Sequence, residues 1–200
     1  MRVDKVILRA AVSTLAAIAA LLAVMILALC FIFPSTMMRI TYDMGMDGAS
    51  IRYAKRAYDY TSDVYFIAFA TEVAIGLGDY ARIETCGEEL IADEDFDAHC
   101  AQKNGLIESA GGYEQYVFGQ VCVAKYRQGE KTEAIEKAFA LVGSGFPQNN
   151  AVAAVLLTAL SQEDGDTVQT VKEKMSEMDA GAFSASDREY FDALLALANG

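Results

Sequence analysis

The chain has 200 residues with only two prolines, no tryptophan and a formal net charge of −12 at pH 7. Because Ala and Leu are abundant and runs of Val, Ile and Thr are few, this composition predicts an all-α fold and disfavours a sheet. Nucleic acids are bound through Lys and Arg, so an acidic chain of this kind argues against nucleic acid as a partner.

The most apolar segment lies near the N-terminus. Residues 10–33 contain no charged side chain, and as a helix they would be about 36 Å long, more than the ~30 Å hydrocarbon core of a bilayer. A short basic tail, residues 1–9, precedes them. The pattern predicts one transmembrane helix that acts as a signal-anchor, followed by a soluble domain over residues 34–200.

Charge predicts the orientation of this anchor. Arg2, Lys5 and Arg9 against Asp4 give residues 1–33 a net charge of +2, so the total of −12 leaves −14 on residues 34–200. Since basic flanks stay on the cytoplasmic side, we expect a single-pass protein of the cell membrane with a cytoplasmic N-terminus and an extracytoplasmic C-terminal domain.

Two kinds of processing signal compete with a retained anchor. A cleaved secretory signal has an apolar stretch of about 7–15 residues that ends at small residues, whereas this stretch is longer and ends at Phe31, Ile32 and Phe33. Residues 27–30 resemble a lipoprotein lipobox, but Leu29 is larger than the residue that this pattern places before its cysteine, here Cys30. Both features favour an uncleaved helix.

The soluble domain reads as short helices separated by Gly, Asp, Ser and Pro. Glycine closes one helix and Asp or Ser begins the next, for example at Gly78-Asp79 and at Gly129. Apolar residues recur at helical spacing, as in Ile67, Ala70, Ala74 and Leu77, while Glu130, Lys131, Glu133, Glu136 and Lys137 read as a solvated face. We predict helices near residues 36–45, 48–61, 64–77, 79–92, 94–107, 112–127, 131–142, 150–161, 166–178 and 186–198.

Two helices joined at a tight glycine, with small residues where they cross, resemble the tetratricopeptide repeat. In residues 126–138 the turn glycine is Gly129, and the small residue of the second helix follows five positions later as Ala134. Residues 75–83 keep the turn, and residues 159–166 keep only its glycine. The resemblance implies a TPR-like solenoid of antiparallel helix hairpins that binds proteins. Its repeat-packing residues would be Gly78, Gly129, Ala134, Ala138 and Gly165.

The sequence offers little for catalysis or metal binding. Cys86, Cys100 and Cys122 have no paired C-x-x-C spacing, and His99 is the only histidine. We therefore expect no catalytic residue, metal site, cofactor or nucleotide, with these cysteines buried and His99 at the surface. A hydrolase that uses a Cys/His or metal site near His99 stays open as an alternative, as does a Cys86–Cys100 disulfide in an oxidising compartment.

Tyrosines gather near the predicted anchor together with basic residues, a combination typical of interface hot spots. A partner-binding patch is expected at Arg52, Tyr53, Lys55, Arg56 and Tyr60. The main hypothesis is a membrane-anchored scaffold or adaptor, not an enzyme, that binds membrane-associated proteins. The same plan of anchor and helical domain resembles ancillary subunits of the bacterial protein-translocation channel, so a role in translocation or as a chaperone is an alternative.

Overall fold

The computed structural model describes residues 2–103, 112–142, 150–162 and 165–200. Across these residues the regular structure consists of eleven α-helices and one short 3-10 helix, Ala180–Ala182, with no strand. The predicted all-α fold is therefore confirmed. The chain divides into two compact units, Met1–Phe66 and Ile67–Gly200, so the boundary falls inside the predicted soluble domain.

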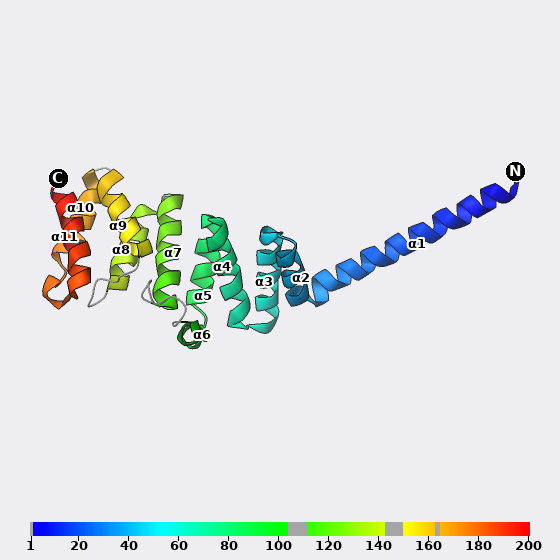
Figure 1. Ribbon diagram of the computed structural model, residues 1–200, viewed down its shortest axis with the longest axis horizontal. Helices are drawn as coiled ribbons and strands as arrows, with labels where there is room; N and C mark the ends of the chain where they lie inside the picture. Colours follow the sequence, from blue (N-terminus) through cyan, green and yellow to red (C-terminus); the bar gives the residue numbers. More distant parts are fainter. Residues whose placement is uncertain (1, 104–111, 143–149, 163–164) are drawn as a thin grey trace. The chain divides into compact units, whose positions relative to one another are not determined.

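The first unit begins with α1 (Arg2–Ile32), the long helix of Figure 1. Its stretch Ile7–Leu29 has a mean hydropathy of 2.6, none of it is buried, and it is the one helix of the described chain that is long and apolar enough to cross a membrane. Pro34 opens α2 (Pro34–Asp43), a first-turn position that suits proline because no backbone N–H is needed there. The hairpin of this unit is completed by α3 (Asp47–Thr61), which packs against α2.

The second unit contains the remaining helices, the first of which begins just before the boundary. They are α4 (Val64–Leu77), α5 (Tyr80–Ile91), α6 (Phe96–Lys103), α7 (Tyr113–Gln128), α8 (Lys131–Val142), α9 (Asn150–Gln162), α10 (Gly165–Ser176) and α11 (Ala185–Asn199). Helices α2 to α11 match the ten predicted ones in order, although the last residues of the predicted helix 94–107 lie outside the described residues. In this unit α7 packs against α5, α6, α8 and α9.

The helix ends are set by the residues expected there. The Asp79 side chain accepts a hydrogen bond from the backbone N–H of Arg82 and so caps α5. Ser184 caps α11 in the same way. Gly129 ends α7 with a φ of 98°, a left-handed conformation that costs glycine little and other residues more.

The largest buried cluster joins α7 to α11. Its members are Cys122, Tyr126, Ala134, Ile135, Ala138, Val152, Val155, Leu156, Ala159, Leu160, Val171, Met175, Phe191, Leu194 and Ala198. The predicted stripe on α4 is only partly correct, because Ile67, Ala70 and Ala74 are buried whereas Leu77 is 48% exposed. Leu77 is the last residue of α4, directly before the turn at Gly78.

Candidate functional site

A buried lysine lies where α5, α7 and α8 meet. Lys125 is the fourth residue from the end of α7, and its side chain is only 5% exposed. Its Nζ lies 2.8 Å from Glu84, 3.0 Å from Glu88, and 3.2 Å from both Glu130 and Glu133. Glu84 and Glu88 come from α5, Glu133 comes from α8, and Glu130 directly precedes α8, so one ammonium group joins three helices.

The electrostatics of this cluster favour the charged forms. Burial alone would lower the pKa of Lys125, but hydrogen bonds to the four glutamates outweigh it and raise the pKa above its ordinary value of 10.5. The pKa of Glu88 is lowered from 4.5, chiefly by its hydrogen bond to Lys137 and, against the opposing effect of burial, also by Lys125. At neutral pH the cluster is therefore a set of ion pairs.

Acid should weaken this cluster in a defined pH range. Because the folded-state pKa of Glu88 lies below 4.5, the stability that its carboxylate contributes is present above about pH 4.5 and is lost as the pH falls through the folded-state pKa. The Glu88→Gln variant should be less stable than wild type at pH 7 and lose less stability between pH 5 and 3. Urea unfolding at several pH values measures both. If Glu88→Gln and wild type lose the same amount of stability between pH 5 and 3, Glu88 is not the source of the acid sensitivity. Glu136→Gln, on the exposed face of α8, serves as the control.

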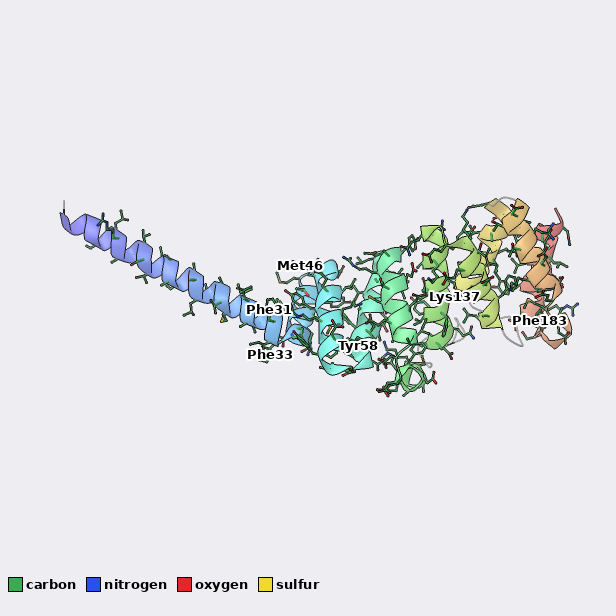
Figure 2. The ribbon with its side chains drawn as sticks, turned by 180° about the vertical axis from the view of Figure 1, so that it is seen from behind. Phe31, Phe33, Met46, Tyr58, Lys137 and Phe183 are labelled. Atoms are coloured by element: carbon green, nitrogen blue, oxygen red, sulfur yellow. The ribbon has the colours of Figure 1, made fainter. Side chains whose placement is uncertain are left out.

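An open groove of about 490 Å³ lies beside the Lys125 cluster, between α5, α7 and α8. Its apolar lining includes Ile91 of α5, Phe118 of α7 and Leu141 of α8. Charged side chains border it, with the ion pair between Lys137 and Glu88 closed at 2.7 Å; Figure 2 labels Lys137 on α8. We define this feature as the α5–α8 groove, lined by Glu88, Ile91, Glu114, Gln115, Phe118, Val121, Cys122, Lys137, Ala140 and Leu141.

The wall of the groove depends on a close approach of α5 to α7. A Cβ at Gly87 of α5 would lie 2.4 Å from Cγ2 of Val121, which is 2% exposed. Val121 is β-branched and has few alternative rotamers in a helix, so it cannot easily move aside. Gly87 therefore sets the spacing of these two helices. This role could not be predicted, because a lone glycine within a helical pattern is usually a tolerated substitution with no contact that requires it.

Replacing Gly87 with alanine tests this contact, because the change in folding stability should have the opposite sign at a crowded and at an open position. Gly87→Ala is expected to destabilise the fold by about 1–3 kcal/mol through overpacking against Val121. Gly76→Ala is the matched control, since Gly76 lies in α4 with nothing within 4 Å of an added Cβ, and it should stabilise by about 0.5–1 kcal/mol through helix propensity. Chemical denaturation gives both values, and a stabilising Gly87→Ala would contradict the close approach.

A second polar cluster surrounds Tyr113 at the start of α7. Its hydroxyl donates a hydrogen bond of 2.7 Å to Glu72 of α4, and Lys103 of α6 pairs with the same carboxylate. The His99 ring packs edge-on against Tyr113, with centroids 5.5 Å apart. His99 is 8% exposed, so the expectation of a surface histidine was wrong. Its ring belongs to the packing between α6 and α7.

This second cluster is poorly suited to a cysteine nucleophile. Cys86, Cys100 and Cys122 are all buried, and the structure has no disulfide bond between Cys86 and Cys100. Burial, together with the charges of Glu114 and Asp97, raises the pKa of Cys100 to about 11. A thiol with that pKa is protonated at neutral pH, whereas the thiolate is the reactive form. Among the described residues, no group of three or more His, Cys, Asp or Glu side chains is placed to hold a metal ion.

The predicted membrane-proximal patch lies on α3. Arg52 and Tyr60 are exposed, while Tyr53, Lys55 and Arg56 are half-buried. The Arg56 guanidinium stacks 4.1 Å from the centre of the Phe31 ring at the end of α1 and donates a 3.4 Å hydrogen bond to the Tyr60 hydroxyl. The structure therefore brings Arg56 and Tyr60 together, and adds Phe31, which the sequence had assigned to the anchor alone.

The predicted packing residues divide into three groups. Ala134 and Ala138 are fully buried on α8, as small residues at a helix crossing should be. Gly78 and Gly129 are exposed and adopt left-handed conformations at turns. Gly165 is exposed at the start of α10, and an added Cβ would meet nothing within 4 Å, so no close contact requires glycine there.

The residue that sequence reasoning missed is Lys125. It lies four positions after Val121 and three after Cys122, on the same helix face as these two buried residues, and that spacing is the signal that could have identified it. Glu130 and Glu133 were read as solvated charges, and both are exposed as residues, but their carboxylates reach Lys125.

Comparison of this chain with protein-family models, with curated proteins and with solved structures finds no match.

Proposed function

We propose that this protein is a membrane-anchored adaptor that is not an enzyme, held by α1 and binding a segment of a protein partner in the α5–α8 groove. The observation that carries the proposal is the groove itself. It combines an apolar lining with a charged border, which is the composition of sites that hold an apolar anchor residue and orient it with a few polar contacts.

The helical unit is proposed to be a TPR-like stack of antiparallel hairpins. In such a stack each helix contacts the next helix and the next but one. Contacts between α7 and α9, between α8 and α10, and between α9 and α11 follow this rule. The tight turn at Gly129 and the buried Ala134 occupy the positions that the resemblance assigns to them. These features support the stack without requiring strict repeats.

The partner segment is proposed to place one or more apolar side chains on Phe118 and Leu141. A volume of about 490 Å³ lies within the roughly 300–1,000 Å³ of typical ligand pockets. Grooves between helices commonly receive an amphipathic helix through residues at i, i+3, i+4 and i+7. Lys137 and Glu88 at the border would then select for the charge pattern that flanks the apolar residues.

The proposed setting is the cell membrane, with the N-terminus in the cytoplasm and the helical domain outside. A role as an ancillary subunit in protein translocation or as a chaperone fits the same plan, because both need an anchored surface for a passing or partner polypeptide. A hydrolase centred on His99 is the weaker alternative, because the Cys100 thiol beside it is held protonated at neutral pH.

Site-specific photocrosslinking in native membranes tests the adaptor function. A photoreactive phenylalanine analogue replaces Ala140, which lines the groove, or Ala81, an exposed alanine of α5 that does not. We expect discrete crosslinked products from position 140 and none of the same mass from position 81. Products common to both positions, or no product from position 140, would contradict a partner in the groove.

A further inference from the structure

The short helix α2 has three distinct faces. Pro34, Met38 and Thr41 are buried within the first unit, at the spacing of one helical stripe. A second stripe follows the same spacing one residue earlier and consists of Phe33, Met37, Ile40 and Met44. Phe33 immediately precedes the helix and Met44 immediately follows it, so this stripe runs along the whole of α2.

The second stripe is apolar and exposed. Phe33 is 52% exposed, Ile40 41% and Met44 68%, while Met37 is half-buried. At 100° per residue the two stripes are neighbours, and the charged Arg39 and Asp43 lie on the opposite side of the helix. The apolar arc of α2 is therefore wider than its packing in the hairpin needs. An arc of this kind is typical of a helix that lies in a membrane interface.

The stripe is continuous with the proposed transmembrane helix. Only Phe33 separates α1 from α2, and Phe31, Ile32 and Phe33 are all more than half exposed. Figure 2 shows Phe31 and Phe33 at the end of α1 next to α2. Arg56 of α3 stacks on Phe31, so its guanidinium lies beside the end of α1.

The net charge of the first unit suits contact with an anionic lipid surface, whereas that of the second unit does not. In residues 34–66 four basic side chains balance four acidic ones, so residues 1–66 carry a net charge of +2 and residues 67–200 carry −14. Anionic headgroups therefore do not repel the α2–α3 hairpin, and Arg39 can extend its guanidinium from the apolar boundary to the headgroups. The tyrosines and arginines of α3 suit the same layer, because such side chains anchor proteins at membrane interfaces.

We propose that α2 lies in the membrane interface where α1 emerges, with Phe33, Met37, Ile40 and Met44 among the lipid acyl chains. This inference rests on the proposed anchoring by α1. The hairpin then fixes how the rest of the chain leaves the bilayer, because α2 lies along the membrane and does not extend away from it. The partner of this surface is lipid, and the stripe continues the apolar surface of α1 on one side of the membrane.

Tryptophan fluorescence can test the proposal because the chain has no tryptophan of its own. The full-length protein carries one of three substitutions: Ile40→Trp in the stripe, Tyr42→Trp about 160° away around the same helix, or Leu21→Trp in the middle of α1. Each variant is reconstituted in phosphatidylcholine vesicles whose acyl chains are brominated near the headgroup or near the chain ends. Bromine quenches tryptophan by contact.

We expect strong quenching of Ile40→Trp by the shallow bromine, several-fold weaker quenching of Tyr42→Trp, and strong quenching of Leu21→Trp by the deep bromine. If Leu21→Trp is quenched and Ile40→Trp is not, α1 spans the membrane but α2 does not lie in its interface, which overturns the proposal. A stripe that is covered by protein would give this result. Equal quenching of Ile40→Trp and Tyr42→Trp would also overturn it. Unquenched Leu21→Trp would overturn the anchor itself. Met44→Trp repeats the stripe measurement at a more exposed position.

Discussion

Lys125→Met is expected to destabilise the folded chain by about 3 kcal/mol, in the range found when one partner of a buried ion pair is removed. The loss arises because Glu84, Glu88, Glu130 and Glu133 would face one another without the ammonium group that now lies within 3.2 Å of each. Methionine keeps the volume and flexibility of the lysine stem, so the change isolates the charge. Unfolding by urea, followed by circular dichroism of the full-length chain in mild detergent, measures the difference.

A second variant on α7 and the pH dependence of stability provide the controls for Lys125→Met. Arg127→Met removes an exposed basic side chain two residues further along α7 and should change stability by less than about 0.5 kcal/mol. Because the pKa of Lys125 is raised in the folded state, its contribution to folding stability is complete up to about pH 10.5. This contribution is lost as the pH rises further through the folded-state pKa. Below about pH 4.5 protonation of Glu88 should reduce the loss of stability caused by Lys125→Met. A penalty that is the same at pH 7 and pH 3.5 would contradict the ion-pair account.

Ala134→Phe should have an effect of similar size for a steric reason. Ala134 is fully buried in α8 within the cluster that joins α7 to α11. A phenyl ring there has no space, and overpacking of this kind costs roughly 1–3 kcal/mol or more. Thermal unfolding should show a drop in Tm of about 2–4 °C for each kcal/mol.

The matched control for Ala134→Phe is Ala140→Phe, six residues later on the same helix at an exposed position that lines the groove. It should leave Tm nearly unchanged, because an exposed position has room for the ring. Equal Tm values for Ala134→Phe and wild type would show that α8 does not pack through this face.

Helix positions could be predicted from the sequence because they depend on local chemistry. Gly78-Asp79 ends one helix and begins another through a left-handed glycine and an aspartate cap, and both effects act within a few residues. The α4 (Val64–Leu77) and α8 (Lys131–Val142) boundaries were predicted to the residue for this reason. Leu77 was placed wrongly, because periodicity indicates a face but not where the neighbouring helices end.

The groove and its border could not be predicted, because they depend on contacts between distant residues. Lys125 meets Glu84 across 41 positions of the chain, and Lys137 meets Glu88 across 49. The spacing of Lys125 from Val121 and Cys122 indicates a buried face, but it does not show which acidic side chains neutralise the lysine. Glycine is needed at position 87 because Val121 of α7 lies directly opposite it. His99 was predicted at the surface, but its ring packs against Tyr113 of α7, which is 14 positions away in the chain.

Alkaline carbonate extraction of membranes containing the full-length chain tests most directly whether α1 anchors this helical protein in a bilayer. The account predicts that the chain stays in the membrane pellet, and that Ile18→Lys combined with Leu22→Lys in the span releases it to the supernatant. Release of the wild-type chain by carbonate would contradict the account.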